Sequence, residues 1–117
     1  KDYIIEKNNV FVVEGYFDYF SMIDNGLKNC VALCGTAFTK AHFLKLSFFT
    51  DTITFILDTD ESGVKSAKRT WNNFCGRGVK LRFIKLPSGF KDPDEFFKLC
   101  EHRDFEKFTH SYIPEEW

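Results

Sequence analysis

Several features that mark membrane or exported proteins are missing from this sequence. No apolar run in its 117 residues approaches the roughly 20 residues that a membrane-spanning helix needs, which excludes a transmembrane helix. Lys1 to Glu6 lack the apolar core and cleavage site of a secretory signal, so we expect a cytoplasmic location. The absence of a starting methionine suggests a piece of a longer chain. The length suits one domain, 1–117, and is too short for two.

The sequence also lacks a C-x-x-C pair. We expect buried free thiols rather than a disulfide framework, because a domain of this size can build its own core. A zinc site made from Cys30, Cys34 and a distant histidine is the alternative, although this spacing does not match the usual zinc knuckles and the histidines show no ligand spacing. The four cysteines are Cys30, Cys34, Cys75 and Cys100.

Acidic residues are absent between positions 65 and 91, although the net charge of the whole chain is only −1. Basic and acidic regions are therefore segregated along the chain. Such a segment is usually a solvated helix face with strand edges, and it gives weak support for a polyanionic partner. Its eight basic residues are Lys65, Lys68, Arg69, Arg77, Lys80, Arg82, Lys85 and Lys91.

Short apolar runs alternate with helical patterns along the chain, which predicts an α/β domain with a mainly parallel sheet. The segment 79–86 alternates apolar and basic residues, which favours a strand with one solvent-exposed side or an edge strand. From Glu101 onward we expect a further helix. The expected strands are 10–13, 30–33, 52–57 and 79–86, and the expected helices are 16–25, 40–48, 64–74 and 93–99.

Thr39 is expected to cap the helix over 40–48. Ala41, Leu44 and Phe48 share one face of that helix by their spacing, which predicts the apolar face of an amphipathic helix. The fifteen phenylalanines are most simply core residues, and any that prove exposed would indicate a partner surface.

Carboxylates follow three of the four predicted strands. If these strands are parallel, their carboxyl ends share one edge of the sheet, where ligands of such folds bind. Gathered carboxylates repel one another unless a cation holds them, and an oxygen-only set favours Mg²⁺, with Mn²⁺ able to substitute. Asp18 lies one helical turn after Glu14 and would face the same crevice. The candidate metal ligands are Glu14, Asp18, Asp58, Asp60, Asp92 and Asp94.

A capping role is the alternative for the aspartates. Asp58 and Asp60 would then be turn and N-cap residues before the helix at Val64, and Asp92 or Asp94 would cap the last helix. Capping accounts poorly for Glu14, which follows four apolar residues, and for acids that recur at successive strand ends.

Two further pairs are candidates for phosphate or nucleic-acid contact. Gly35 and Thr36 form a turn where the backbone approaches either a phosphate or a neighbouring strand. Lys65 and Arg69, one turn apart on a helix, either meet phosphates or form part of a solvated face.

Four blocks of the sequence together carry a family resemblance. They are Val12-Val13-Glu14-Gly15-Tyr16-Phe17-Asp18, Gly35-Thr36-Ala37-Phe38-Thr39, Leu57-Asp58-Thr59-Asp60-Glu61-Ser62-Gly63 and Lys91-Asp92-Pro93-Asp94-Glu95. In this order and spacing, from Val10 to Phe97, they resemble the Toprim domain of bacterial DnaG-type DNA primases.

The resemblance implies a Rossmann-like Toprim fold and magnesium-dependent joining of ribonucleoside triphosphates on a single-stranded DNA template. It implies that Glu14, Asp58 and Asp60 are catalytic and bind metal, with a general acid or base role for Glu14. Asp18, Asp92 and Asp94 would complete the acidic cluster. The replicative helicase would bind through domains that this fragment lacks, and the isolated fragment is expected to be inactive.

This chain departs from the family pattern in two places. Thr59 stands where the family usually has glycine, and Ser62 stands where it has alanine; neither change removes a ligand. The zinc-binding module, the basic template-holding subdomain and the helicase-binding domain of primases have no counterpart in these residues.

Other functions stay open at this stage. Toprim topoisomerases, overcoming-lysogenization-type nucleases and recombination mediators share the glutamate and the D-x-D motif. The stretch Asp58-Thr59-Asp60 also resembles haloacid-dehalogenase-type phosphatases, although that reaction has no use for Glu14. A binding module whose acids hold a structural ion is a third alternative.

Overall fold

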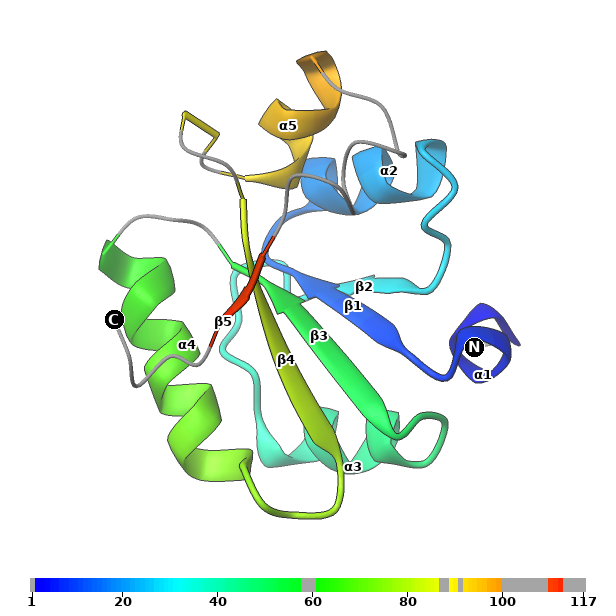
Figure 1. The fold of residues 1–117 in the computed structure, drawn as a ribbon, viewed down its shortest axis with the longest axis vertical. Helices are drawn as coiled ribbons and strands as arrows, with labels where there is room; N and C mark the ends of the chain where they lie inside the picture. The colour runs from blue at the N-terminus through cyan, green and yellow to red at the C-terminus, as the bar shows by residue number, and fades with distance from the viewer. Residues whose placement is uncertain (1, 58–60, 87–88, 91, 100–109, 113–117) are drawn as a thin grey trace.

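The computed structural model describes residues 2–57, 61–86, 89–90, 92–99 and 110–112, and it shows a five-stranded sheet (Figure 1). The spatial order of the strands is β2-β1-β3-β4-β5. The first four strands are parallel, and β5 runs antiparallel to β4, so the predicted α/β fold with a mainly parallel sheet is confirmed. The strands are β1 (Val10–Val13), β2 (Cys30–Ala32), β3 (Thr52–Ile56), β4 (Lys80–Lys85) and β5 (His110–Tyr112).

The register of the sheet brings three strand ends to one edge. Val13 pairs with Ala32 of β2 on one side and with Ile56 of β3 on the other. The residues that follow these three strands therefore emerge beside one another. This alignment decides where Glu14 lies, because Glu14 directly follows Val13.

Helices cover both faces of the sheet (Figure 1). One face packs with α2 and α5, and its apolar cluster includes Val13, Met22, Ile56 and Phe96. The other face packs with α3 and α4, where the core includes many of the aromatic side chains. The helices are α1 (Asp2–Lys7), α2 (Tyr16–Asp24), α3 (Lys40–Ser47), α4 (Glu61–Phe74) and α5 (Pro93–Leu99).

Stacked and edge-to-face rings fill the core between α3, α4 and the sheet. Phe55 of β3 stacks on Phe83 of β4 with ring centroids 5.0 Å apart, and Phe38 meets Phe55 edge-on at 4.9 Å. Such ring pairs add to the free energy gained by burying apolar area. These phenylalanines therefore form core, as predicted.

The buried side of α3 differs from the predicted one. Thr39 caps this helix as expected, since its Oγ1 accepts a hydrogen bond from the backbone N–H of His42 at 3.3 Å. The face with Ala41, Leu44 and Phe48 points to solvent, however, and Phe48 is 88% exposed. Phe43 is buried instead, because its ring stacks on Phe74 of α4 at 4.9 Å.

Of the two alternatives predicted for β4, a strand with one solvent-exposed side and an edge strand, the edge strand is wrong. β5 pairs with its outer side, and Lys85 lies opposite His110. Neither β5 nor α1 was expected from the sequence, and α4 begins at Glu61, three residues before the predicted start. The helix expected from Glu101 falls mostly outside the described residues. Among the described helices, none has both the length and the apolar character that crossing a bilayer requires.

Among the cysteines that the structure describes, the prediction of buried thiols holds for Cys30 alone. Cys30 is a buried free cysteine, and burial raises its pKa to about 12. Cys34 and Cys75 are free but exposed, because they lie in a turn and after the end of α4. Cys100 lies outside the described residues. Within the described part of the chain, no three cysteine, histidine or acidic residues are grouped so as to hold a metal, so the zinc alternative gains no support.

Candidate functional site

Glu14 lies where β1 leaves the sheet, and the β1–β2 pairing holds its backbone. The N–H of Leu33 donates to the carbonyl of Val13 at 2.9 Å, and the N–H of Cys34 donates to the carbonyl of Glu14 at 2.9 Å. These bonds continue the ladder beyond the last paired residue of β1. The half-buried Glu14 is therefore presented from a rigid strand end at the ligand-binding edge of the sheet.

Among the described residues, four carboxylates line one cavity of about 320 Å³ at this edge, which we call the acidic hollow. They come from the end of β1, from α2 and from the start of α5, segments that are far apart in the sequence. The parallel sheet gathers them as predicted. The acidic hollow is lined by Glu14, Gly15, Tyr16, Phe17, Asp18, Asp92 and Asp94.

Asp18 links the first turns of two helices. Its Oδ2 accepts a hydrogen bond from the backbone N–H of Gly15 at 3.3 Å, and its Oδ1 accepts one from the N–H of Asp94 at 3.1 Å. The side chain is buried, and this burial raises its pKa to about 6. The negative charge of Asp92 raises the pKa further, whereas the hydrogen bonds from the two backbone amides lower it.

The other two aspartates of the hollow also have partners. Ser21 Oγ donates a hydrogen bond to Asp94 Oδ1 at 2.6 Å, and Lys98 Nζ lies 3.3 Å from Asp94 Oδ2. These contacts, the Ser21 bond first, lower the pKa of Asp94. Asp92 Oδ1 accepts a hydrogen bond from the N–H of Glu95 at 2.9 Å, so Asp92 caps α5 as the capping alternative predicted.

The donors around the hollow suit a hard divalent cation, because every ionisable side chain among the described residues that line it is a carboxylate or the phenol of Tyr16. A cation would relieve the repulsion between the carboxylates, which already contributes to the raised pKa of Asp18. The described residues alone contain no close group of three ligands. Asp58 and Asp60, two of the predicted ligands, lie outside the described residues.

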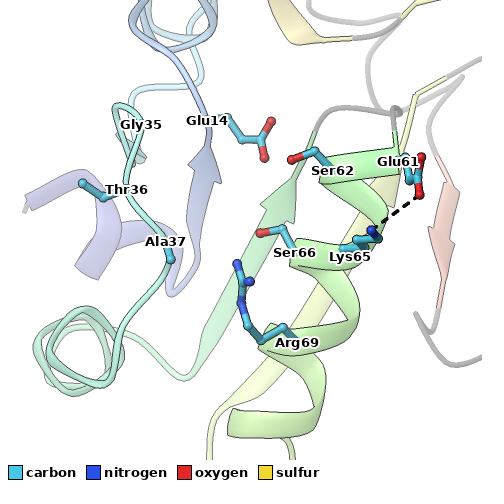
Figure 2. A pocket seen from close by; sticks show the side chains of 9 residues that line it. All are labelled: Glu14, Gly35, Thr36, Ala37, Glu61, Ser62, Lys65, Ser66 and Arg69. Carbon is cyan, nitrogen blue, oxygen red and sulfur yellow. Dashed lines mark ion pairs between the residues drawn. The ribbon is translucent and has the colours of Figure 1, made fainter.

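A larger cavity of about 820 Å³ opens on the other side of Glu14, between α4 and residues 35–37 (Figure 2). We call it the α4 cleft. Ser62, Ser66 and Arg69 point from α4 toward Glu14 and the 35–37 segment. The cleft is lined by Glu14, Gly35, Thr36, Ala37, Glu61, Ser62, Lys65, Ser66 and Arg69.

The two predicted cations of the α4 cleft differ in their surroundings. Lys65 Nζ lies 3.5 Å from the carboxylate of Glu61 on the same helix, and both side chains are largely exposed. Arg69 forms no ion pair with any residue that the structure describes, and its guanidinium extends into the cleft (Figure 2). Arg69 is therefore the stronger candidate for a phosphate contact.

The turn that carries Gly35 forms the opposite wall of the cleft. Cys34 and Gly35 have φ angles of 54° and 84°, and the N–H of Thr36 donates to the carbonyl of Leu33 at 3.2 Å. These are the features of a type I′ turn, which favours glycine. The Thr36 hydroxyl also donates to the carbonyl of Leu33, at 2.6 Å, and its side chain points away from the cleft (Figure 2).

The sequence of this chain also matches a known protein family. The sequence model of the family described as Toprim-like matches residues 11–97. The chain belongs to the Toprim-like family. The matched range runs from β1 into α5 and includes every residue that lines the acidic hollow and the α4 cleft.

Named relatives of this Toprim-like chain are DNA primases. It is 39% identical over 111 residues to the DNA primase of Aquifex aeolicus, which covers 95% of this chain and 22% of that protein. The structure of the zinc-binding and RNA polymerase domains of the Aquifex aeolicus primase matches 95% of this chain and 28% of that one, with a TM-score of 0.82 at 32% identity. A DnaG primase catalytic domain bound to single-stranded DNA matches 86% of this chain and 32% of that one, with a TM-score of 0.73 at 32% identity.

Sequence reasoning missed the two serines that line the α4 cleft and the serine that donates to Asp94. Ser62 and Ser66 lie one turn apart on α4 and, together with Arg69, follow the spacing of one helix face, a signal that was available in the sequence. Ser21 had no such signal, because its partner Asp94 lies 73 residues away.

Proposed function

We propose that this Toprim-like chain is the catalytic Toprim domain of a DNA primase, in which it joins ribonucleoside triphosphates into an RNA primer on single-stranded DNA. The chain spans about a fifth of the Aquifex aeolicus relative, so the activity of the whole protein is part of the proposal. One observation carries it: Glu14 borders both the acidic hollow and the α4 cleft.

The two cavities suit the two kinds of group in nucleotidyl transfer. The acidic hollow offers carboxylate oxygens for Mg²⁺, with Mn²⁺ as a substitute, and the ligands would be Glu14, Asp18, Asp92 and Asp94 together with Asp58 and Asp60. When bound, the divalent cation would neutralise charge on the reacting phosphates. The α4 cleft offers a guanidinium and two serine hydroxyls to the same phosphates.

Side chains of this chain would take the remaining roles in the reaction. Arg69 would hold triphosphate oxygens in the cleft, and Ser62 and Ser66 would donate hydrogen bonds to them. Glu14, at the boundary of the two cavities, would take the proton of the primer hydroxyl as a general base. Gly35 would keep the turn opposite α4 in its left-handed conformation and so preserve the width of the cleft.

Partners of the whole protein follow from the same proposal. Single-stranded DNA is the proposed template, which is supported by the related DnaG catalytic domain bound to single-stranded DNA. A replicative helicase would bind through segments outside this chain. The proposal includes a cytoplasmic location and no membrane partner.

Primer synthesis by the full-length protein tests the proposal. The Glu14→Gln variant keeps the size of the side chain and removes its charge, and it should abolish RNA synthesis on single-stranded DNA with ribonucleoside triphosphates and Mg²⁺. Glu6→Gln is the matched control, because Glu6 lies on α1 and lines neither cavity. Asp58→Ala should also abolish synthesis while the protein stays folded.

Two outcomes would contradict the proposal. Full primer synthesis by Glu14→Gln would exclude this site as the catalytic one. Cleavage of DNA by the wild-type protein without any nucleotide polymerisation would instead favour the nuclease or topoisomerase branch of the family.

A further inference from the structure

Two residues of α2 hold Asp94 of α5 at two points. Asp18 accepts a hydrogen bond from the backbone N–H of Asp94, and Ser21 donates one to the Oδ1 atom of its side chain at 2.6 Å. Asp18 and Ser21 are three residues apart, so they lie on the same face of α2. The backbone and the carboxylate of Asp94 are thus both placed by α2.

The two oxygens of the Asp94 carboxylate have unequal partners. Oδ1 has the short, partly buried bond from Ser21. Oδ2 has Lys98, whose side chain is 70% exposed and lies one turn along the same helix. The Asp94 side chain is 26% exposed, and an ion pair whose cation is this exposed contributes little to stability.

We propose that Ser21 is a positioning residue for Asp94. Its hydroxyl keeps Oδ1 in place and leaves Oδ2 as the exchangeable oxygen, which passes from Lys98 to a divalent cation bound in the acidic hollow. Side chains that orient a carboxylate ligand in this way commonly decide how tightly the site binds its metal. The inference rests on the proposed function, since it assumes a divalent cation in the acidic hollow.

Mn²⁺ binding to the full-length protein, followed by electron paramagnetic resonance, tests this role directly. Ser21→Ala should weaken Mn²⁺ binding about tenfold. Ser21→Thr keeps a hydroxyl at the same position and should restore most of the affinity. Lys98→Gln should bind Mn²⁺ at least as tightly as the wild type, because it removes the competing cation from Oδ2.

Ser47→Ala is the matched control. Ser47 also lies on a helix and donates its hydroxyl, to the carbonyl of Leu44 at 2.8 Å, but it lines neither the acidic hollow nor the α4 cleft. This variant should bind Mn²⁺ as the wild type does. A general effect of removing a helical serine would appear in both variants.

A second measurement separates positioning from a structural role. In primer synthesis, Ser21→Ala should raise the Mg²⁺ concentration needed for half-maximal rate about tenfold and leave the rate at saturating Mg²⁺ unchanged. A merely structural role would lower the melting temperature in EDTA without shifting the metal requirement.

The outcomes distinguish the two proposals. If the wild type binds Mn²⁺ and Ser21→Ala binds it equally well, Ser21 does not position Asp94 and the inference is overturned while the proposed function stands. If the wild type binds no Mn²⁺, the proposed function and the inference are overturned together.

Discussion

The Oδ1 atom of Asp18 accepts a hydrogen bond at 3.1 Å from the backbone N–H of Asp94, a residue 76 positions later in the chain. The other oxygen of the same carboxylate accepts the N–H of Gly15, at the start of α2. One buried side chain therefore ties α5 to α2 and sets the distance across the acidic hollow. Its protonation state should consequently affect the stability of the fold.

We expect stability to fall as the pH rises through the pKa of Asp18. Burial raises this pKa from 3.8 to about 6, so between these values the folded state retains a proton that the unfolded state has lost. The stabilisation is complete below the unfolded pKa and is lost as the pH passes the folded one. The free energy of unfolding should decrease by up to about 3 kcal/mol across this window.

Urea denaturation in EDTA at a series of pH values measures this effect. Asp94 acts in the opposite direction, because its pKa is lowered, so the comparison is made between the wild type and Asp18→Asn. In Asp18→Asn, this decrease in the free energy of unfolding should be absent. Asp24→Asn, at an exposed position of α2, should retain it. An equal pH dependence in Asp18→Asn and the wild type would show that Asp18 keeps an ordinary pKa.

Arg69 should matter more than Lys65 for nucleotide binding. Its guanidinium extends into the α4 cleft, whereas the ammonium of Lys65 pairs with Glu61 (Figure 2). Because hydrogen bonds between charged groups are strong, Arg69→Ala should raise the KM for ribonucleoside triphosphates about tenfold or more. Lys65→Ala should raise it by less.

Steady-state primer synthesis gives both KM values. Lys68→Ala is the matched control, since Lys68 is exposed on α4 and does not line the cleft. If Lys65→Ala raises KM more than Arg69→Ala does, the phosphates lie nearer the start of α4 than we propose.

Truncation should destabilise the protein strongly at Phe43 of α3 and hardly at all at Phe48, the residue that follows this helix. Phe43 is buried and stacks on Phe74, so Phe43→Ala should lower the free energy of unfolding by about 3 to 5 kcal/mol. Phe48 is 88% exposed, and Phe48→Ala should change it by less than about 0.5 kcal/mol. Chemical denaturation of both variants measures the difference, and a large loss in Phe48→Ala would mean that its ring is covered by a partner.

Apolar patterning predicted most of the sheet and the helices around it. Val10–Val13 is a short apolar run of the kind that a buried parallel strand requires, Thr52–Ile56 combines apolar residues with β-branched threonines, and both are strands. The strand His110–Tyr112 carries no comparable pattern. It forms because the outer edge of β4 has backbone groups that can pair with another strand, and this edge exists only once the sheet has folded.

Periodicity located α3 but did not decide which face it buries. Phe43 and the face of Leu44 and Phe48 both offer apolar area, so the helical pattern alone permits either orientation. The ring of Phe74 on α4 selects Phe43, because stacking two aromatic side chains buries a large area. This choice depends on the position of another helix, which lies outside the range of a local pattern.

The sequence by itself determined that acids stand at the ends of strands. It follows that Glu14, Asp18, Asp92 and Asp94 would lie close together if those strands were parallel. The physical reason is local: a buried strand must be apolar, and polar residues mark where it ends. Only the tertiary structure decided how these acids are held. The hydrogen bonds that the Asp94 N–H donates to Asp18 and that Ser21 donates to the Asp94 carboxylate join residues more than 70 positions apart, and such contacts depend on how α2 packs on α5.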